Sequence, residues 1–360
     1  MSRAGRSAVA GFVVIAACAV AGAQGPIVKY GDPVPRDVRE MYDAGVRYLL
    51  KTQDASGGWK DGQAGPGVTG MGVMVFLASG EDPNYGPYRE PIRKALRSMI
   101  VAQDPNTGFL GGNGGHESMY QHGFAMLSLA EAYGAVDDRG LWGAADSAQR
   151  SRQRSLGQAL ELAVRCAVTS AKQNPVGAWR YGPDAKDADT SVSGAVMMGL
   201  LAARNAGIEV PDETMAKACK YFLSMIGPNG QAGYSGGPGG GSDAVTSIAV
   251  LVLSIARQKD APQLKKAVQY LKSRSRDGQS PMESYPSYTR YYRAQALFQV
   301  DVEAWEKWNM GLVRELKALQ GKDGSFSGFA SRGGFGGTVD TSLALLALAV
   351  NFKFMPIYER

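Results

Sequence analysis

The sequence has few of the residues and motifs by which common enzyme classes are recognised. It contains only two histidines and three cysteines in 360 residues. It has neither a Gly-x-Ser-x-Gly nucleophile elbow nor a Gly-x-x-x-x-Gly-Lys-Ser/Thr phosphate-binding loop. Glycine-rich stretches such as "GGPGGGS" at residues 236–242 lack the preceding strand that a dinucleotide site requires. These absences argue against nucleophile-elbow hydrolases, P-loop enzymes and dinucleotide-dependent enzymes.

The first residues have the pattern of an export signal. Arg3 and Arg6 form a positive region, an apolar stretch too short to span a bilayer follows, and residues 21–23 make a small-residue cleavage site. The sequence therefore predicts a signal peptide over residues 1–23 and an exported protein of the periplasm or cell envelope. In an alternative interpretation, Cys18 is the lipidated residue of a lipoprotein, which would associate the protein with a membrane.

Little positive charge and few thiols remain once the signal peptide is removed. The formal net charge falls from +6 to +4 because Arg3 and Arg6 leave, and the rest of the chain has no basic cluster. This distribution argues against nucleic acid as a partner. Cys166 and Cys219 lie among apolar residues of predicted helices, which predicts two buried thiols; a disulfide is the alternative in an oxidising compartment.

One sequence unit recurs about six times along the chain. Its clearest copy is "VRYLLKTQDASGGW" at residues 46–59, an amphipathic helix that ends in Gln, followed by a polar turn, Gly and an aromatic residue. Recurrence at this spacing indicates a repeat architecture. We expect the Gln to bind free helix carbonyls, the Gly to allow a left-handed turn, and the aromatic to pack on the neighbouring repeat. The other copies lie at residues 96–109, 166–179, 222–234, 313–326 and, in a weaker form, 268–280.

A second kind of helix follows each unit. The helix predicted at residues 190–207 is apolar on almost every side, whereas that at 214–226 carries Lys217 and Lys220 on one face. Helices that are apolar all round are buried, and those with a polar stripe face water. The alternation predicts an all-α (α/α)6 toroid, with six inner and six outer helices, as a single domain over residues 41–360 after an N-terminal extension at 24–40. The inner helices are expected to begin near Thr69, Tyr120, Ser191, Thr246, Thr289 and Thr341.

The spacing of Gln, Gly and aromatic residue resembles the repeat of the squalene cyclases and the protein prenyltransferase β-subunits. The end of the chain, from "YYRAQALF" at residues 291–298 to "TSLALLALAV" at 341–350, is similar to exported single-toroid members of that superfamily. The resemblance covers about residues 40–358. It implies the terpenoid cyclase and protein prenyltransferase type of toroid, while the function is left open because one fold hosts many sites.

The glycine-rich connections lead into the inner-helix N-termini, so their polar residues are expected to ring one mouth of a central cavity. We predict that this cavity binds an apolar or extended small molecule. The segment "YPSYTRYYR" at residues 285–293 has four Tyr and two Arg at a helix start, where the dipole favours negative charge. An unpaired Arg there would bind an anionic or polar group; in the alternative, Asp187, Asp189, Asp243 and Asp340 pair with the two arginines. The candidate ligand-binding residues are His116, Glu117, Tyr120, His122, Asp243, Tyr288, Arg290, Tyr291, Tyr292, Arg293 and Asp340.

Asp187 and Asp189 are the candidate catalytic residues, and a helix cap is the competing interpretation. The resemblance to squalene cyclases places Asp189 on the central acid of an Asp-x-Asp-Asp motif, but Thr190 stands where the third Asp belongs. The tripeptide at residues 189–191 recurs at 340–342, and a repeated Asp-Thr-Ser at helix starts favours N-capping. We therefore expect caps at both places.

No metal and no cofactor are expected. The zinc site of the prenyltransferases needs Asp, Cys and His together, yet both histidines lie in the second unit while Cys166 and Cys219 lie on outer helices. The predicted function is a ligand-binding or scaffolding toroid without a complete catalytic set. One alternative is an acid-initiated isoprenoid cyclase that uses Asp189; the other is a carbohydrate-active lyase or hydrolase that uses Arg290, Tyr291 and the carboxylates at the mouth. A deep aromatic pocket would favour an isoprenoid, an open cleft with paired carboxylates a sugar, and a filled cavity a scaffold.

Overall fold

The computed structural model describes residues 34–59, 65–112, 118–143, 150–275, 285–326 and 335–355. The chain divides into two units, Met1–Pro33 and Val34–Arg360. The first unit, with the predicted signal peptide, Cys18 and most of the predicted extension, lies outside the described residues, and so do His116 and Glu117.

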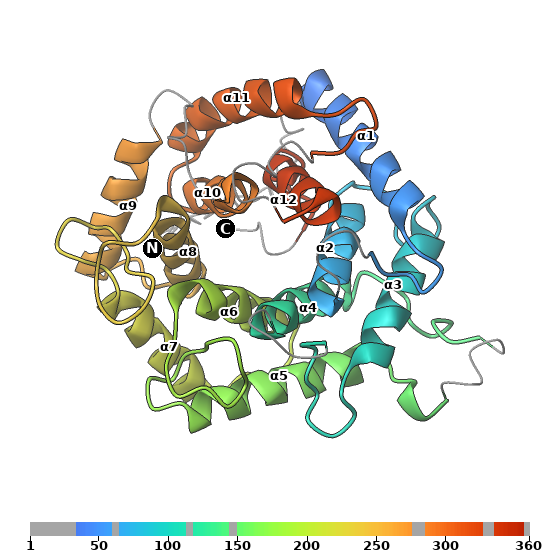
Figure 1. Ribbon diagram of the computed structural model, residues 1–360, viewed down its shortest axis with the longest axis horizontal. Coiled ribbons are helices and arrows are strands. Elements are labelled where there is room, and N and C mark those ends of the chain that lie inside the picture. The colour runs from blue at the N-terminus through green and yellow to red at the C-terminus, as the bar shows by residue number, and fades with distance from the viewer. Residues whose placement is uncertain are drawn as a thin grey trace, which may run out of the picture. The chain divides into compact units, whose positions relative to one another are not determined.

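The second unit is an α/α toroid, as predicted. In the described residues it contains twelve helices and no strand, only isolated bridges. Figure 1 shows an inner ring of helices surrounded by an outer ring. The outer helices are α1 (Arg36–Thr52), α3 (Arg89–Ala102), α5 (Leu156–Gln173), α7 (Asp212–Ser224), α9 (Pro262–Arg274) and α11 (Val302–Leu319). The inner helices are α2 (Pro66–Leu77), α4 (Ser118–Ala132), α6 (Thr190–Asn205), α8 (Asp243–Ile255), α10 (Pro286–Val300) and α12 (Gly337–Ala349).

The two rings differ in burial as their sequence patterns predict. Every residue of α8 except Ile255 is buried, whereas α9 buries only Leu264, Ala267 and Leu271, at the spacing of one helix face. The six residues predicted near inner-helix starts all lie within the first five residues of their helices. The core therefore lies between the rings and inside the inner one.

A glutamine after an outer helix can bond both its own turn and the next outer helix. Gln103 Nε2 donates to the carbonyl of Gly108 in its own turn and to that of Ala159 in α5. Gln53 makes the same pair of bonds to its own turn and to α3. In the third unit Asn174, and not the predicted Gln173, follows the outer helix, because α5 continues through Gln173; its Nδ2 donates to the carbonyls of Ala185 and Asp187 in the connection before α6 and not to α7.

The glycine of the repeated turn is required by both its backbone angle and its surroundings. Gly324 has φ 91°, and a Cβ added there would lie 2.2 Å from the carbonyl oxygen of Ala44 in α1. A side chain at this point would separate the turn from the next outer helix. The same positive φ and close approach to a carbonyl oxygen of the next outer helix recur at Gly57, Gly108 and Gly230.

The aromatic residue of the turn anchors its own outer helix more than the neighbouring repeat. Trp59 Nε1 donates to the carbonyl of Leu49, and Trp179 Nε1 to that of Ala167, each at 2.9 Å. Tyr234 does not follow this pattern: it is 37% exposed and faces Tyr181. The expectation of a packing aromatic in every unit is therefore wrong for the fourth.

Both remaining cysteines are buried free thiols, as predicted, and burial raises the pKa of Cys166 to about 11. None of the described helices has the length and apolarity needed to cross a membrane.

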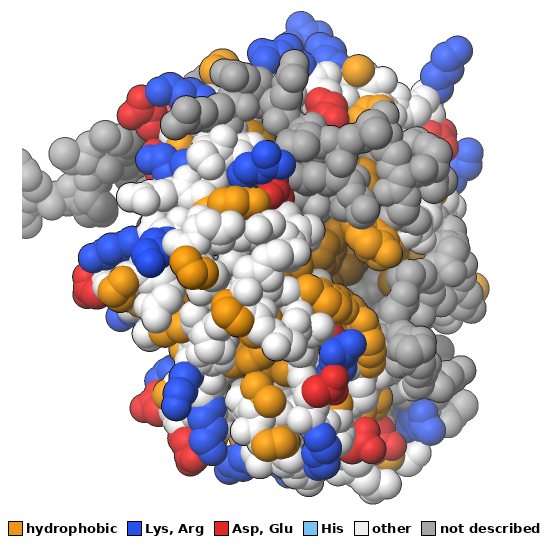
Figure 2. Space-filling view, turned by 60° about the vertical axis from the view of Figure 1, so that its left-hand side comes forward, with side chains coloured by type: hydrophobic (Ala, Val, Ile, Leu, Met, Phe, Trp, Pro, Cys, Tyr) orange, Lys and Arg blue, Asp and Glu red, His pale blue; other side chains and the backbone are white. Residues whose placement is uncertain are grey.

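Figure 2 shows one face on which hydrophobic side chains gather around a hollow, with most charged side chains toward its edges.

Candidate ligand-binding cavity

A cavity of about 480 Å³ lies at the N-terminal ends of the inner helices. Each inner helix, or the connection that precedes it, contributes to its wall. The parallel arrangement of the inner ring brings these starts together at one end, which is where the sequence predicts the mouth. The volume falls in the range of small-molecule sites.

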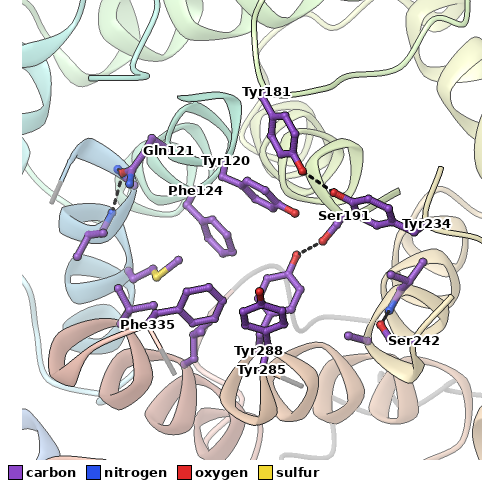
Figure 3. A pocket seen from close by; sticks show the side chains of 17 residues that line it. Tyr120, Gln121, Phe124, Tyr181, Ser191, Tyr234, Ser242, Tyr285, Tyr288 and Phe335 are labelled. Atoms are coloured by element: carbon purple, nitrogen blue, oxygen red, sulfur yellow. Dashed lines mark hydrogen bonds between the residues drawn. The ribbon is translucent and has the colours of Figure 1, made fainter. Parts of the chain in front are cut away.

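One side of the cavity is formed by hydroxyl groups (Figure 3). The hydroxyls of Tyr181 and Tyr234 are 2.6 Å apart, and Ser191 Oγ lies 2.8 Å from the Tyr288 hydroxyl. Tyr120 also lines this side of the cavity, beside Ser191 (Figure 3). We call these five residues the hydroxyl cluster; they come from α4, α6, α10 and the connections before α6 and α8.

The other side of the cavity is mostly apolar; the amide of Gln121 also lines it, and its Oε1 accepts from the backbone N–H groups of Gly67 and Val68. Phe124 and Phe335 lie across the cavity from Ser191 and Tyr234 (Figure 3). Tyr285, half-exposed, stacks on Phe335 with the ring centroids 5.2 Å apart. The apolar wall consists of Val68, Met71, Phe124, Phe335, Val339 and Leu343.

The hydroxyls of Tyr120, Tyr234 and Tyr288 stay protonated. Burial is the main cause that raises the pKa of Tyr120, Tyr234 and Tyr288, and the nearby Asp189 carboxylate raises each further. Each group therefore presents one hydrogen-bond donor and acceptor lone pairs. The cavity combines an apolar wall with neutral hydrogen-bonding groups.

Asp189 is the N-cap of α6, as expected. Its Oδ1 accepts from the backbone N–H of Val192 at 2.7 Å, and the side chain is fully buried. Its Oδ2 has no hydrogen-bond partner and lies 3.6 Å from Arg180 Nε. Burial raises the pKa of Asp189 to about 6. Asp187 is exposed and pairs with Arg180 at 2.9 Å, and neither carboxylate belongs to the cavity wall.

Asp340 does not cap α12, so the expected equivalence with Asp189 is wrong. The helix begins at Gly337, and Asp340 lies inside its first turn. Its carboxylate accepts from Ser287 Oγ and from the N–H groups of Phe335 and Gly336, which ties α10 and the entry of α12 together. Asp340 is fully buried and does not line the cavity.

A different polar position is repeated along the inner helices. Thr341 Oγ1 accepts from the N–H of Phe326, and Ser193 Oγ accepts from the N–H of Trp179, so Thr341 corresponds to Ser193 and not to Thr190. His122 holds the same position in α4: Nδ1 accepts from Leu110, and Nε2 faces the Ala163 carbonyl at 3.1 Å. Burial lowers the pKa of His122 to about 4, so it is neutral, and it lies outside the cavity wall.

The arginines of "YPSYTRYYR" face carboxylates and not the cavity. Arg293, fully buried, donates to Asp243 Oδ2 at 2.8 Å, and Asp243 also accepts from Arg274. Arg290 pairs with Glu315 of α11. Buried guanidinium groups need such partners, so the expectation that these charges ring the mouth is wrong.

Of the predicted ligand-binding residues, Tyr120 and Tyr288 are in the cavity wall. Tyr291 and Tyr292 are buried beside it, on other faces of α10. Sequence reasoning missed Tyr181, Phe124 and Phe335 and took Tyr234 for a packing residue. An aromatic inside a glycine-rich connection, such as Phe335 in "GGFGG", is a signal that could have identified one of them. Within the described ranges, no group of three His, Cys, Asp or Glu side chains could hold a metal.

Fold and site together define an α/α toroid with a central cavity of small-molecule size. No family model matches the sequence, and a search of curated proteins finds no match. Solved structures share the fold. The type II terpene cyclase MstE from Scytonema is 17% identical with a TM-score of 0.57, over 88% of this chain and 98% of that chain.

Two further structures show the same architecture. The GH76A alpha-1,6-mannanase from Salegentibacter sp. HEL1_6 is 10% identical with a TM-score of 0.59, over 87% of this chain and 98% of that chain. A protein from Actinoplanes is 16% identical with a TM-score of 0.57 over the same shares. At such identities the likeness shows the fold, which a cyclase and a glycosidase have in common.

Proposed function

We propose that the protein is an exported toroid of the squalene-cyclase and prenyltransferase superfamily that binds an apolar, isoprenoid-like molecule in its cavity. The observation that carries the proposal is the apolar wall, in which aromatic, aliphatic and thioether side chains surround an open volume. Burying apolar ligand surface against such a wall releases about 25 cal/mol per Å². The cavity is open, which weighs against a purely scaffolding role.

The structural neighbours supply a supporting example. MstE has been solved with geranylgeranyl dihydroxybenzoate as substrate and with merosterolic acid A as product. Export to the periplasm or cell envelope, with or without a lipid on Cys18, is part of the proposal and rests on residues 1–23 alone. Western blotting of cell fractions would test it.

A pair of matched variants tests the cavity as the binding site. Met71→Trp fills the apolar wall, whereas Met310→Trp makes the same change at a side chain that is 58% exposed on α11. We expect Met71→Trp to weaken binding of phytol and squalene by about tenfold or more, and Met310→Trp to leave it unchanged. Equal affinities for the wild type and both variants, measured by tryptophan-fluorescence titration, would reject the cavity.

Native mass spectrometry of the wild type purified from its own envelope complements this test. We expect an apolar molecule to co-purify and to be reduced in Met71→Trp but retained in Met310→Trp. A molecule retained equally by both variants would place the binding elsewhere.

A second function, acid-initiated cyclisation, is favoured by one observation. Asp189 Oδ2 is buried without a hydrogen-bond partner, and the raised pKa of the carboxyl keeps a fraction protonated near neutral pH. Incubation with squalene, followed by gas chromatography of the products, tests it: cyclic products from the wild type and none from Asp189→Asn would establish the acid. The carbohydrate-active alternative has weaker support, because Arg290 pairs with Glu315 and Tyr291 is buried, and neither belongs to the cavity wall.

A further inference from the structure

The hydroxyl cluster lies on one side of the cavity, and this arrangement constrains the polar end of the ligand, which the apolar wall alone does not. We propose that the ligand is an amphiphile with an uncharged hydroxyl end, which binds at the hydroxyl cluster while its apolar chain lies against the apolar wall. This inference rests on the proposed function, because it takes the cavity as the binding site.

Hydroxyl groups from separate parts of the fold converge at one side of the cavity. Ser191 starts α6, Tyr288 starts α10, and Tyr181 and Tyr234 come from two connections, yet they meet as pairs 2.8 and 2.6 Å apart. A hydroxyl can donate once and accept twice, so a hydrogen bond to one neighbour uses only part of its capacity. The cluster can therefore both donate to and accept from a further hydroxyl.

A negatively charged ligand end fits the hydroxyl cluster poorly. The Asp189 carboxylate acts electrostatically on Tyr120, Tyr234 and Tyr288, so an anion bound among these hydroxyls would meet the same negative potential. The guanidinium groups that would attract an anion are held by carboxylates: Arg293 by Asp243 and Arg290 by Glu315.

A positively charged ligand end also fits the hydroxyl cluster poorly. The guanidinium of Arg180 lies over the rings of Tyr181 and Tyr234, with its carbon 5.0 and 6.0 Å from the ring centroids. Its charge is close to the aromatic faces that a ligand cation would use, and it is balanced by Asp187 and Asp189. Charges of both signs thus lie just outside the cluster and already pair with each other, which leaves an uncharged end as the best fit.

The orientation follows from the opposite wall. Phe124 and Phe335 lie across from Ser191 and Tyr234, so a molecule with its hydroxyl at the cluster directs its chain toward α2 and α12 (Figure 3). Met71 and Leu343 line that side.

The test is a ligand series with one branched chain and four ends: phytol, phytanic acid, phytanylamine and phytane. We expect the wild type to bind phytol about tenfold more tightly than phytane, which corresponds to about 1.4 kcal/mol, and more tightly than either ion. Tyr288→Phe and Ser191→Ala remove one hydroxyl each with little change in shape. Both should lose most of the preference for phytol and keep their affinity for phytane, which also reports that they are folded.

Tyr85→Phe is the matched control, because Tyr85 is 90% exposed; it should bind the whole series as the wild type does. Equal binding of phytol and phytane by the wild type, or a preference for phytanic acid or phytanylamine, would overturn the hydroxyl end while leaving an apolar-ligand cavity. Failure of all four to bind would overturn both proposals.

Discussion

The turns after the outer helices and the starts of the inner helices lie at the same end of the repeat. The turns have the same geometry from unit to unit, whereas the inner-helix starts differ. The turns of Gly57, Gly108, Gly230 and Gly324 share a positive φ and a close approach to the next outer helix. The inner starts differ in what they turn toward the cavity: Ser191 in α6, Tyr288 in α10, Val339 and Leu343 in α12.

Features that repeat from unit to unit belong to the contacts between consecutive outer helices. Features that differ between units belong to the cavity. Ala232 and Tyr234 show the difference. Ala232 holds the position of Trp179, because its backbone N–H donates to Thr246 as that of Trp179 donates to Ser193, whereas Tyr234, two residues later, is exposed and pairs with Tyr181 at the hydroxyl cluster. Variants at the two kinds of position should therefore have different consequences.

The largest effect is expected at a repeated turn. Gly324→Ala forces a side chain into a left-handed backbone and against the Ala44 carbonyl, and should lower the free energy of unfolding by about 3–4 kcal/mol. Gly134→Ala is the control, since Gly134 has φ 90° but no atom within 4 Å of an added Cβ; it should cost only about 1–2 kcal/mol. Urea unfolding measures both. Equal costs would mean that contact with the next helix is not what the turn preserves.

A smaller effect, which depends on pH, is expected at the start of α6. The folded-state pKa of Asp189, about 6, lies above the ordinary value of 3.8, so the folded protein binds the proton more tightly than the unfolded chain. The contribution of this group to stability is therefore present at low pH and is lost as the pH rises through about 6. Asp189→Asn keeps a capping side chain but cannot titrate.

The stability of the wild type relative to Asp189→Asn should be greater at about pH 4.5 than at about pH 7.5, by roughly 2 kcal/mol. Thermal unfolding at the two values measures this difference. Parallel stability profiles of the two proteins would contradict a raised pKa.

The smallest effect on stability is expected at Tyr234. Tyr234→Phe removes an exposed hydroxyl and should cost less than about 0.5 kcal/mol, whereas Trp179→Phe removes a buried indole and its bond to Ala167 and should cost about 2 kcal/mol. Tyr234→Phe should instead weaken phytol binding. If both substitutions destabilised the protein equally, Tyr234 would be a packing residue after all.

The fold could be predicted from the sequence because it depends on patterns spread over whole helices. The largely apolar sequence of α8 and the one-sided pattern of α9 assign each helix to its ring without reference to any single contact. The cap at Asp189 could be predicted for a similar reason, since it depends only on a local backbone geometry.

Side-chain direction could not be predicted in the same way. Successive residues of a helix point about 100° apart, so a residue near a helix start can face the cavity, as Tyr288 does, or the packed core, as Tyr291 and Tyr292 do. The Asp340 error came from matching Asp-Thr-Ser in the two units, which set Thr341 against Thr190, three residues before its structural equivalent Ser193. Matching letters alone shifted the alignment of the two units.

The bond from Gln320 Nε2 to the Met41 carbonyl, 2.8 Å long, joins residues 279 positions apart. It uses the same side-chain chemistry as the bonds between consecutive units, so the sixth unit contacts the first in the way that the first and second units contact the units that follow them, and the ring closes. An open solenoid has two exposed ends and needs specialised capping repeats with polar outer faces. A closed ring has none, and each unit here is buried on both sides by a neighbour of its own kind. During synthesis, however, the free edge of α1 stays without its partner until the Gln320 turn has emerged, so the first unit is the last to be fully protected.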